Sequence, residues 1–232
     1  MIDTFECLIA SLAETLNGAE VPCILWGQCL LNIHGIASSI DSIDFVVPTA
    51  YLNEASKALD NFRGLVPCTY GHDCLWSPKK RKAEEPPYHL HLEASTVTVA
   101  LYVQARILWF LPEIGSCLTL EEQQLYLLPR LILASNSTAL PPRRPDRGSG
   151  FFMSGKYPVI VPRLCLLMET FMRLYIRDKK KREGAYARTV IRLLTPYVEN
   201  EEHPGSVEIS DLVRRHYETL ARGDELVLPR AP

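Results

Sequence analysis

Asp44 is the residue of this sequence best placed for chemistry, because it enters a short apolar strand predicted over residues 43–47. A carboxylate at such a place can hold the metal ion of a metal-bound triphosphate. Gly27 follows another apolar strand, predicted over residues 22–26, and a glycine there lets the backbone approach a phosphate closely. Gln28 then opens a short helix, whose free N–H groups and positive dipole end favour the same anion. The sequence therefore predicts a phosphate-binding turn at Gly27 beside a metal-binding Asp44, with a plain turn at Gly27 as the alternative.

The elements that would position these residues follow one another within residues 21–48. They are a strand, a glycine turn, a helix to His34, a polar loop and a second strand. This order resembles the nucleotidyltransferase superfamily, whose signature is Gly-Ser or Gly-Gly, a helix, and two carboxylates spaced by one residue on the next strand. Gln28 stands where the superfamily has Ser or Gly, and Ser42 stands where it has the first carboxylate.

Later segments are similar to those of a group of uncharacterised fungal proteins with a nucleotidyltransferase-like core. The similar segments are residues 107–112, 133–136 and 157–162, with the Arg/Pro/Gly tract at 141–150. The resemblance implies an α+β fold, with a nucleotidyltransferase-like core of a mixed β-sheet flanked by helices and a C-terminal helical bundle. It also implies Mg²⁺ and ATP or another nucleoside triphosphate as cofactors, with Gly27, Gln28 and Ser42 next to the nucleotide.

Two-metal nucleotidyl transfer needs carboxylates on one face of a strand, and alternate strand positions share a face. The partner of Asp44 would be Ser42, which cannot carry charge. Asp41 is the nearest other acid, but a regular strand directs it to the opposite face, so only a bulge or turn at Ser42 brings it to Asp44. The third carboxylate that the resemblance implies would be Glu93, at the end of a strand predicted over residues 88–93. The catalytic candidates are thus Asp44, Asp41 and Glu93, and the candidate metal ligands are Asp44 and Asp41.

Composition indicates a packed globular protein. The chain has 232 residues, of which 47% are hydrophobic and 22% charged, and this balance argues against disorder. A formal net charge of −2 gives no global attraction to nucleic acid or to an anionic membrane, and no apolar run approaches the length of a membrane span. We expect a cytoplasmic protein whose partners are a nucleotide or another protein. The basic run at Lys79–Lys82 is a nuclear-localisation patch, a nucleic-acid contact or a solvated surface loop.

Cysteine and histidine residues give no zinc motif in the linear sequence. The seven cysteines are scattered, and the odd count fits a reducing compartment in which most of them act as small core residues. Cys68 and Cys74 flank His72, but no second pair of ligands follows at a recognised spacing, so no zinc site is predicted. His89 and His91 alternate with leucines along a predicted strand and share one of its faces, where an imidazole would be a poor ligand for Mg²⁺.

The chain is expected to divide into a core over residues 1–140, a connector over 141–161 and a helical part over 162–232. In the core, periodicity predicts helices over residues 3–17 and 49–62, strands over 65–70 and 95–103, and a further helix from a capping box at 119–122. In the helical part, helices are predicted over residues 162–178, 185–194 and 209–222, the second of them ended by Pro196. The connector carries Arg143, Arg144 and Arg147, which either clamp a phosphate or lie in a solvated linker.

Three functions fit these features. The first is a catalytically degenerate nucleotidyltransferase-like protein that binds a nucleotide or a protein partner, because Ser42 replaces an acid and Gln28 replaces Ser or Gly. The second is an active Mg²⁺-dependent nucleotidyltransferase that moves a nucleotidyl group to a small molecule, an RNA end or a protein hydroxyl. The third is a protein-interaction module with a vestigial cleft, whose mark would be a filled space between Gly27 and Asp44.

Overall fold

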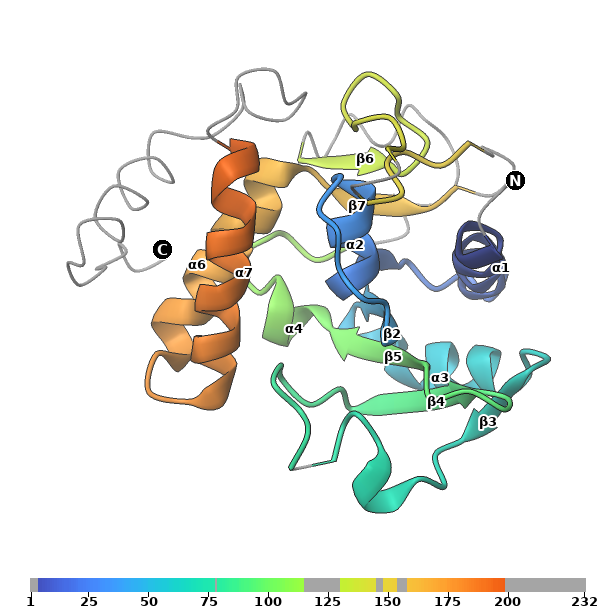
Figure 1. Cartoon of the computed structure of the whole chain (residues 1–232). Coiled ribbons are helices and arrows are strands. Elements are labelled where there is room, and N and C mark those ends of the chain that lie inside the picture. The colour runs from blue at the N-terminus through green and yellow to red at the C-terminus, as the bar shows by residue number, and fades with distance from the viewer. Residues whose placement is uncertain (1–3, 78, 115–129, 145–147, 154–157, 199–232) are drawn as a thin grey trace. The chain divides into compact units, whose positions relative to one another are not determined.

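The structure, a computed structural model, describes residues 4–77, 79–114, 130–144, 148–153 and 158–198 (Figure 1). The chain forms two compact units, of which the first comprises residues 1–81 and 85–162 and the second residues 82–84 and 163–232. Within the described ranges, none of the helices has both the length and the apolar character that crossing a membrane requires. The helices predicted from the capping box at 119–122 and over residues 209–222 lie outside these ranges, as does Arg147.

The first unit is built on a five-stranded mixed sheet with the order β1-β2-β5-β4-β3 (Figure 1). β2 and β5 are parallel, whereas the β1–β2, β5–β4 and β4–β3 pairs are antiparallel. The strands are β1 Ile24–Trp26, β2 Ser42–Val47, β3 Leu65–Pro67, β4 Tyr88–Leu92 and β5 Thr98–Val103. The predicted α+β class with a mixed sheet is confirmed.

The apolar runs of the sequence explain which strands are buried. Every residue of β1 and β2 is buried, including the polar Ser42 and Asp44, which alternate with apolar residues at the start of β2. The helices in the described part of this unit are α1 Thr4–Gly18, α2 Gly27–Ile33, α3 Leu52–Asp60 and the short α4 Gln104–Ile107, with 3-10 turns η1 Thr49–Tyr51 and η2 Gly71–Asp73. Leu12 and Leu16 of α1 and Leu59 of α3 are fully buried, so the stripe predicted over residues 3–17 is a core-facing stripe.

The first unit also contains a second sheet, which has two strands. β6 Leu131–Leu133 pairs antiparallel with β7 Ile160–Pro162. The intervening chain joins this sheet through the Phe152 N–H, which donates to the Ala134 carbonyl at 2.8 Å. His34, at the end of α2, is fully buried, and its Nε2 lies 2.9 Å from the Pro162 carbonyl oxygen, so it ties α2 to β7.

In the second unit, α6 Leu164–Asp178 and α7 Arg182–Val198 run side by side (Figure 1). Buried Asp178 organises the turn between them, because its carboxylate accepts hydrogen bonds from Arg177 Nε at 2.8 Å and Lys181 Nζ at 2.9 Å. The prediction that Pro196 ends the helix is wrong, since α7 continues to Val198. Proline lacks one i→i−4 hydrogen bond, but the helix continues past Pro196 despite this loss.

Candidate functional site

Gly27 and Asp44 meet where β1 passes into α2. Trp26, the last residue of β1, pairs with Asp44 on β2, and Gly27 follows with φ +71°. A Cβ atom added to Gly27 would lie 2.2 Å from Asp44 Oδ2. Both the backbone conformation and the available space therefore require glycine at this position. The close approach predicted at Gly27 exists, and what it packs against in this structure is the Asp44 carboxyl group.

Asp44 is the last member of a chain of side-chain hydrogen bonds that starts on the loop before β4. The indole Nε1–H of Trp76 donates to Thr98 Oγ1 at 3.1 Å, and Thr98 Oγ1 donates to Ser42 Oγ at 2.6 Å. Ser42 Oγ in turn donates to Asp44 Oδ1 at 2.5 Å. All four residues are buried, so these bonds are shielded from water. Ser42 stands where the resemblance implies the first carboxylate, and its hydroxyl group donates a hydrogen bond to Asp44.

The pKa of Asp44 is set by burial. Desolvation raises this pKa from the ordinary 3.8 to about 7, while the hydrogen bond from Ser42 lowers it. A buried carboxyl whose pKa lies near neutrality is characteristic of functional sites, because folding has to hold it there at a cost to stability.

Asp41, which precedes β2, is hydrogen-bonded to Gln28 and to Ser39 and makes no contact of this kind with Asp44. The backbone N–H of Asp41 donates to Gln28 Oε1 at 2.9 Å, and its carboxylate, exposed to solvent, accepts from Ser39 Oγ at 3.3 Å. β2 pairs with β5 in continuous register from Ser42 onward, so it has no bulge there. Asp41 and Asp44 are therefore not brought to one face of the strand.

Glu93 lies just beyond the end of β4, exposed, with its backbone N–H bonded to the Gly64 carbonyl. His89 of β4 is level with Asp44, because both pair with Ala100 of β5. Glu93 follows four residues later, roughly 13 Å further along the sheet at the usual rise of a strand. It is not brought to Asp44.

The donor atoms around Asp44 do not fit a pair of Mg²⁺ ions. Mg²⁺ prefers oxygen ligands and is held by carboxylates in two-metal sites. On the face of Asp44, the adjoining strand β5 offers Thr98 and Ala100, and the next strand, β4, offers His89 and His91. Among the described strands, Asp44 is thus the single carboxylate of this face.

A cavity of about 200 Å³ lies beside α2, between α1 and the segment after residue 140. Its polar lining includes the cations Arg143 and Arg144, Asn32 and the buried acid Glu6, and its apolar lining includes Ile9 and Phe152. Cys29 of α2 also lines the cavity, and its thiol lies 3.5 Å from the Ser42 backbone oxygen. The cavity thus adjoins the start of β2, and two of the three connector arginines, for which a phosphate clamp and a solvated linker were the alternatives, line its wall.

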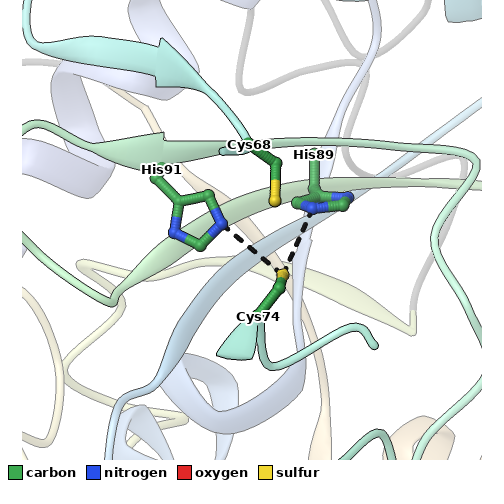
Figure 2. Close-up of side chains that lie close together, drawn as sticks. All are labelled: Cys68, Cys74, His89 and His91. Atoms are coloured by element: carbon green, nitrogen blue, oxygen red, sulfur yellow. Dashed lines mark hydrogen bonds between the residues drawn. The ribbon is translucent and has the colours of Figure 1, made fainter. Parts of the chain in front are cut away.

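A second group of reactive side chains lies near the β3–β4 edge of the sheet, where Cys68, Cys74, His89 and His91 converge (Figure 2). His72, which lies between Cys68 and Cys74 in the sequence, is exposed and outside this group. The signal that could have found the right histidines was the alternation of His89 and His91, together with an antiparallel pairing of the two predicted strands. That pairing places the residue after β3 next to the start of β4.

Comparison with known proteins found similar solved structures. No protein-family model matches the sequence, and no curated protein matches it. The structure of ANT(2″)-Ia in complex with adenylyl-2″-tobramycin is 10% identical, with a TM-score of 0.45, over 94% of this chain and 99% of that chain. The solution structure of the antibiotic-resistance factor ANT(2″)-Ia is 12% identical, with a TM-score of 0.41, over 96% and 98%. An antigenic nucleotidyltransferase-like protein from Paracoccidioides brasiliensis is 11% identical, with a TM-score of 0.40, over 93% and 90%.

Gly27→Ala is expected to destabilise the protein by about 3 kcal/mol, from left-handed backbone strain and overpacking against Asp44. Gly64→Ala is the matched control, because Gly64 also has a positive φ, +91°, but no atom lies within 4 Å of an added Cβ. It should suffer the backbone strain alone, about 1–2 kcal/mol. Urea unfolding of both variants measures the difference. Equal losses would contradict a tight Gly27–Asp44 contact.

Proposed function

We propose that this protein is a catalytically degenerate nucleotidyltransferase-like protein that binds a nucleotide without transferring it. The observation that carries the proposal is the state of Asp44. It is buried beneath Gly27, bonded to Ser42, and without a second carboxylate on its face of the described sheet. A two-metal transfer reaction requires carboxylates that share the ions, and this face does not supply them.

Nucleotide binding is proposed from two features. The strand–glycine–helix order at residues 21–34 resembles the triphosphate-binding part of nucleotidyltransferases. The cavity beside α2 presents Arg143 and Arg144, and guanidinium groups are suited to bind phosphate oxygens in pairs. Its volume, about 200 Å³, suits the phosphate end of a nucleotide better than the whole molecule.

The two alternative functions require different arrangements of the residues around Asp44. An active Mg²⁺-dependent nucleotidyltransferase needs Asp41 or Glu93 to join Asp44, which requires the start of β2 or the end of β4 to rearrange. A protein-interaction module with a vestigial cleft needs no ligand at all, and the filled space between Gly27 and Asp44 favours it.

Calorimetric titration of ATP and of GTP, each with and without Mg²⁺, separates these functions. We expect binding that is indifferent to Mg²⁺ and unchanged in Asp44→Asn, because the carboxyl group of Asp44 is already satisfied within the fold. The double variant Arg143→Ala/Arg144→Ala should bind at least about tenfold more weakly, since a charge-assisted hydrogen bond contributes about 1.5–3 kcal/mol. The matched control is Arg106→Ala, which removes a cation that does not line the cavity.

Magnesium-dependent binding that Asp44→Asn abolishes would overturn the proposal and favour the active enzyme. Absence of binding for both nucleotides would overturn it as well and favour the interaction module.

A further inference from the structure

Four side chains with metal-binding atoms converge, at separations that suit the ligands of one metal ion. The Sγ atoms of Cys68 and Cys74 and one ring nitrogen each of His89 and His91 all lie within 4.8 Å of one another. Figure 2 shows the two imidazoles reaching the Cys74 sulfur from the same side as Cys68. Cys74 and His91 are buried, whereas Cys68 and His89 are half-buried, so the group lies at the edge of the core.

The fold explains why these four residues converge. His89 and His91 are alternate residues of β4 and so project from one face of the sheet. β3 pairs with β4 through Val66 and His91 and through Pro67 and Leu90, so the same register places Cys68 opposite His89. Cys74 follows the 3-10 turn η2 and returns the loop to these three residues.

The distances match those of a tetrahedral zinc site. With Zn–S bonds of about 2.3 Å and Zn–N bonds of about 2.05 Å, a tetrahedron separates sulfur from nitrogen by roughly 3.6 Å. The Cys74 Sγ lies 3.5 Å from His89 Nε2 and 3.5 Å from His91 Nε2. Both imidazoles thus direct Nε2 at the place where a metal ion bound to Cys74 would sit.

The chemistry of the donors selects the metal. Two thiolates with two neutral imidazoles are borderline-soft ligands that suit Zn²⁺, whereas Mg²⁺ requires oxygen ligands. Four protein ligands leave no open position, which is characteristic of a structural site.

We propose that Cys68, Cys74, His89 and His91 bind one zinc ion in a closed structural site. On binding, the two thiols lose their protons to solvent and the two thiolates neutralise the charge of the ion. The site joins the β3–β4 loop to the sheet. It stands independently of the proposed nucleotide binding, because none of its ligands lines the cavity beside α2.

The ion would also fix Trp76, the first residue of the hydrogen-bond chain to Asp44. The Trp76 backbone N–H lies 3.4 Å from Cys74 Sγ and donates to it, as backbone amides do to metal-bound thiolates. The same residue's indole donates to Thr98. A zinc ion on Cys74 therefore holds the outer end of the chain that supports Asp44.

Metal analysis of the full-length protein, purified from zinc-supplemented cells without chelator, tests the site directly. We expect about one zinc ion per chain by mass spectrometry of the metal content. Reconstitution with Co²⁺ should give the thiolate-to-metal charge transfer and intense d–d bands of a tetrahedral site containing sulfur. Metal-free wild-type protein that stays without zinc or cobalt after reconstitution would overturn the proposal, whatever the variants do.

Matched variants assign the ligands. Cys68→Ser and His89→Gln should each lose at least about tenfold in zinc affinity, whereas Cys7→Ser and His72→Gln should keep the wild-type affinity. Cys7 is an exposed thiol of α1, and His72 is an exposed imidazole beside the site. Unchanged affinity in both ligand variants, or an equal loss in His72→Gln, would overturn the assignment. Because a ligand variant can fail to fold, alkylation of the wild type gives a second test, in which zinc should protect two thiols until a chelator is added.

Discussion

Asp44→Asn is expected to be more stable than the wild type at pH 8, by about 2 kcal/mol. The native carboxyl group has a pKa raised to about 7 by burial, against 3.8 in its ordinary state. Three pKa units correspond to about 4 kcal/mol of unfavourable ionisation, which the substitution removes. The new amide group leaves one N–H donor without a partner next to Gly27, and this lowers the stability of the variant by about 1–3 kcal/mol. Urea unfolding at pH 8, without added divalent cations, measures the difference.

The same substitution should remove a pH dependence. Between pH 4 and pH 7 the unfolded state has released the Asp44 proton while the native state still holds it, so the native state binds more protons. The stability of the wild type should therefore fall as the pH rises through this window and level off above it. Asp44→Asn should lack that fall. Asp41→Asn is the matched control, since it removes an exposed carboxylate three residues away and keeps Asp44. A wild type and an Asp44→Asn variant with parallel pH profiles would contradict a buried, neutral-range Asp44.

Removal of zinc is expected to lower the melting temperature by roughly 10 °C. A ligand that binds only the native state, present at about 1,000 times its dissociation constant, adds about 4 kcal/mol. For a chain of this size, 1 kcal/mol shifts the melting temperature by about 2–4 °C. Thermal melts with and without a strong chelator measure the shift.

The shift caused by the chelator should depend on the four ligands. Cys74→Ser should melt near the temperature of the chelated wild type and should not respond to the chelator. Cys7→Ser should respond as fully as the wild type, because its thiol lies on α1, outside the group. A chelator effect of equal size in Cys74→Ser and in the wild type would show that the stabilising metal binds elsewhere.

The centre of the fold could be predicted from the sequence because its signals are local. The strand, glycine and helix at residues 22–34 were found to within about two residues, since apolar runs and Gly27 mark their limits. The alternation of His89 and His91 likewise placed both on one face. Pro196 misled the prediction of α7, because proline removes one hydrogen bond of a helix without necessarily ending it.

What the sequence could not provide was contact between distant residues. Trp76 lies between the strands predicted over residues 65–70 and 88–93, and its hydrogen bond to Thr98 depends on how the loop between them returns to the sheet. The Cys68–Cys74–His89–His91 group depends on β3 pairing with β4, across a separation of about twenty residues that carries no zinc-binding spacing. Both features are set by strand register, which a single sequence does not reveal.

The hydrogen bonds around Ser42 provide partners for Asp44 in both its ionised and its protonated form. When Asp44 is ionised, Ser42 points its proton at Oδ1. When Asp44 takes up a proton it becomes the donor, and the Thr98 carbonyl, 3.4 Å from Ser42 Oγ, offers that hydroxyl another acceptor. Thr98 Oγ1 donates to Ser42 in both cases, because the indole of Trp76 has no lone pair and fixes the direction of the chain. The hydrogen bonds of Ser42 therefore adapt to either form of Asp44 by rotation of one hydroxyl group, while the cost of ionising Asp44 comes from its burial.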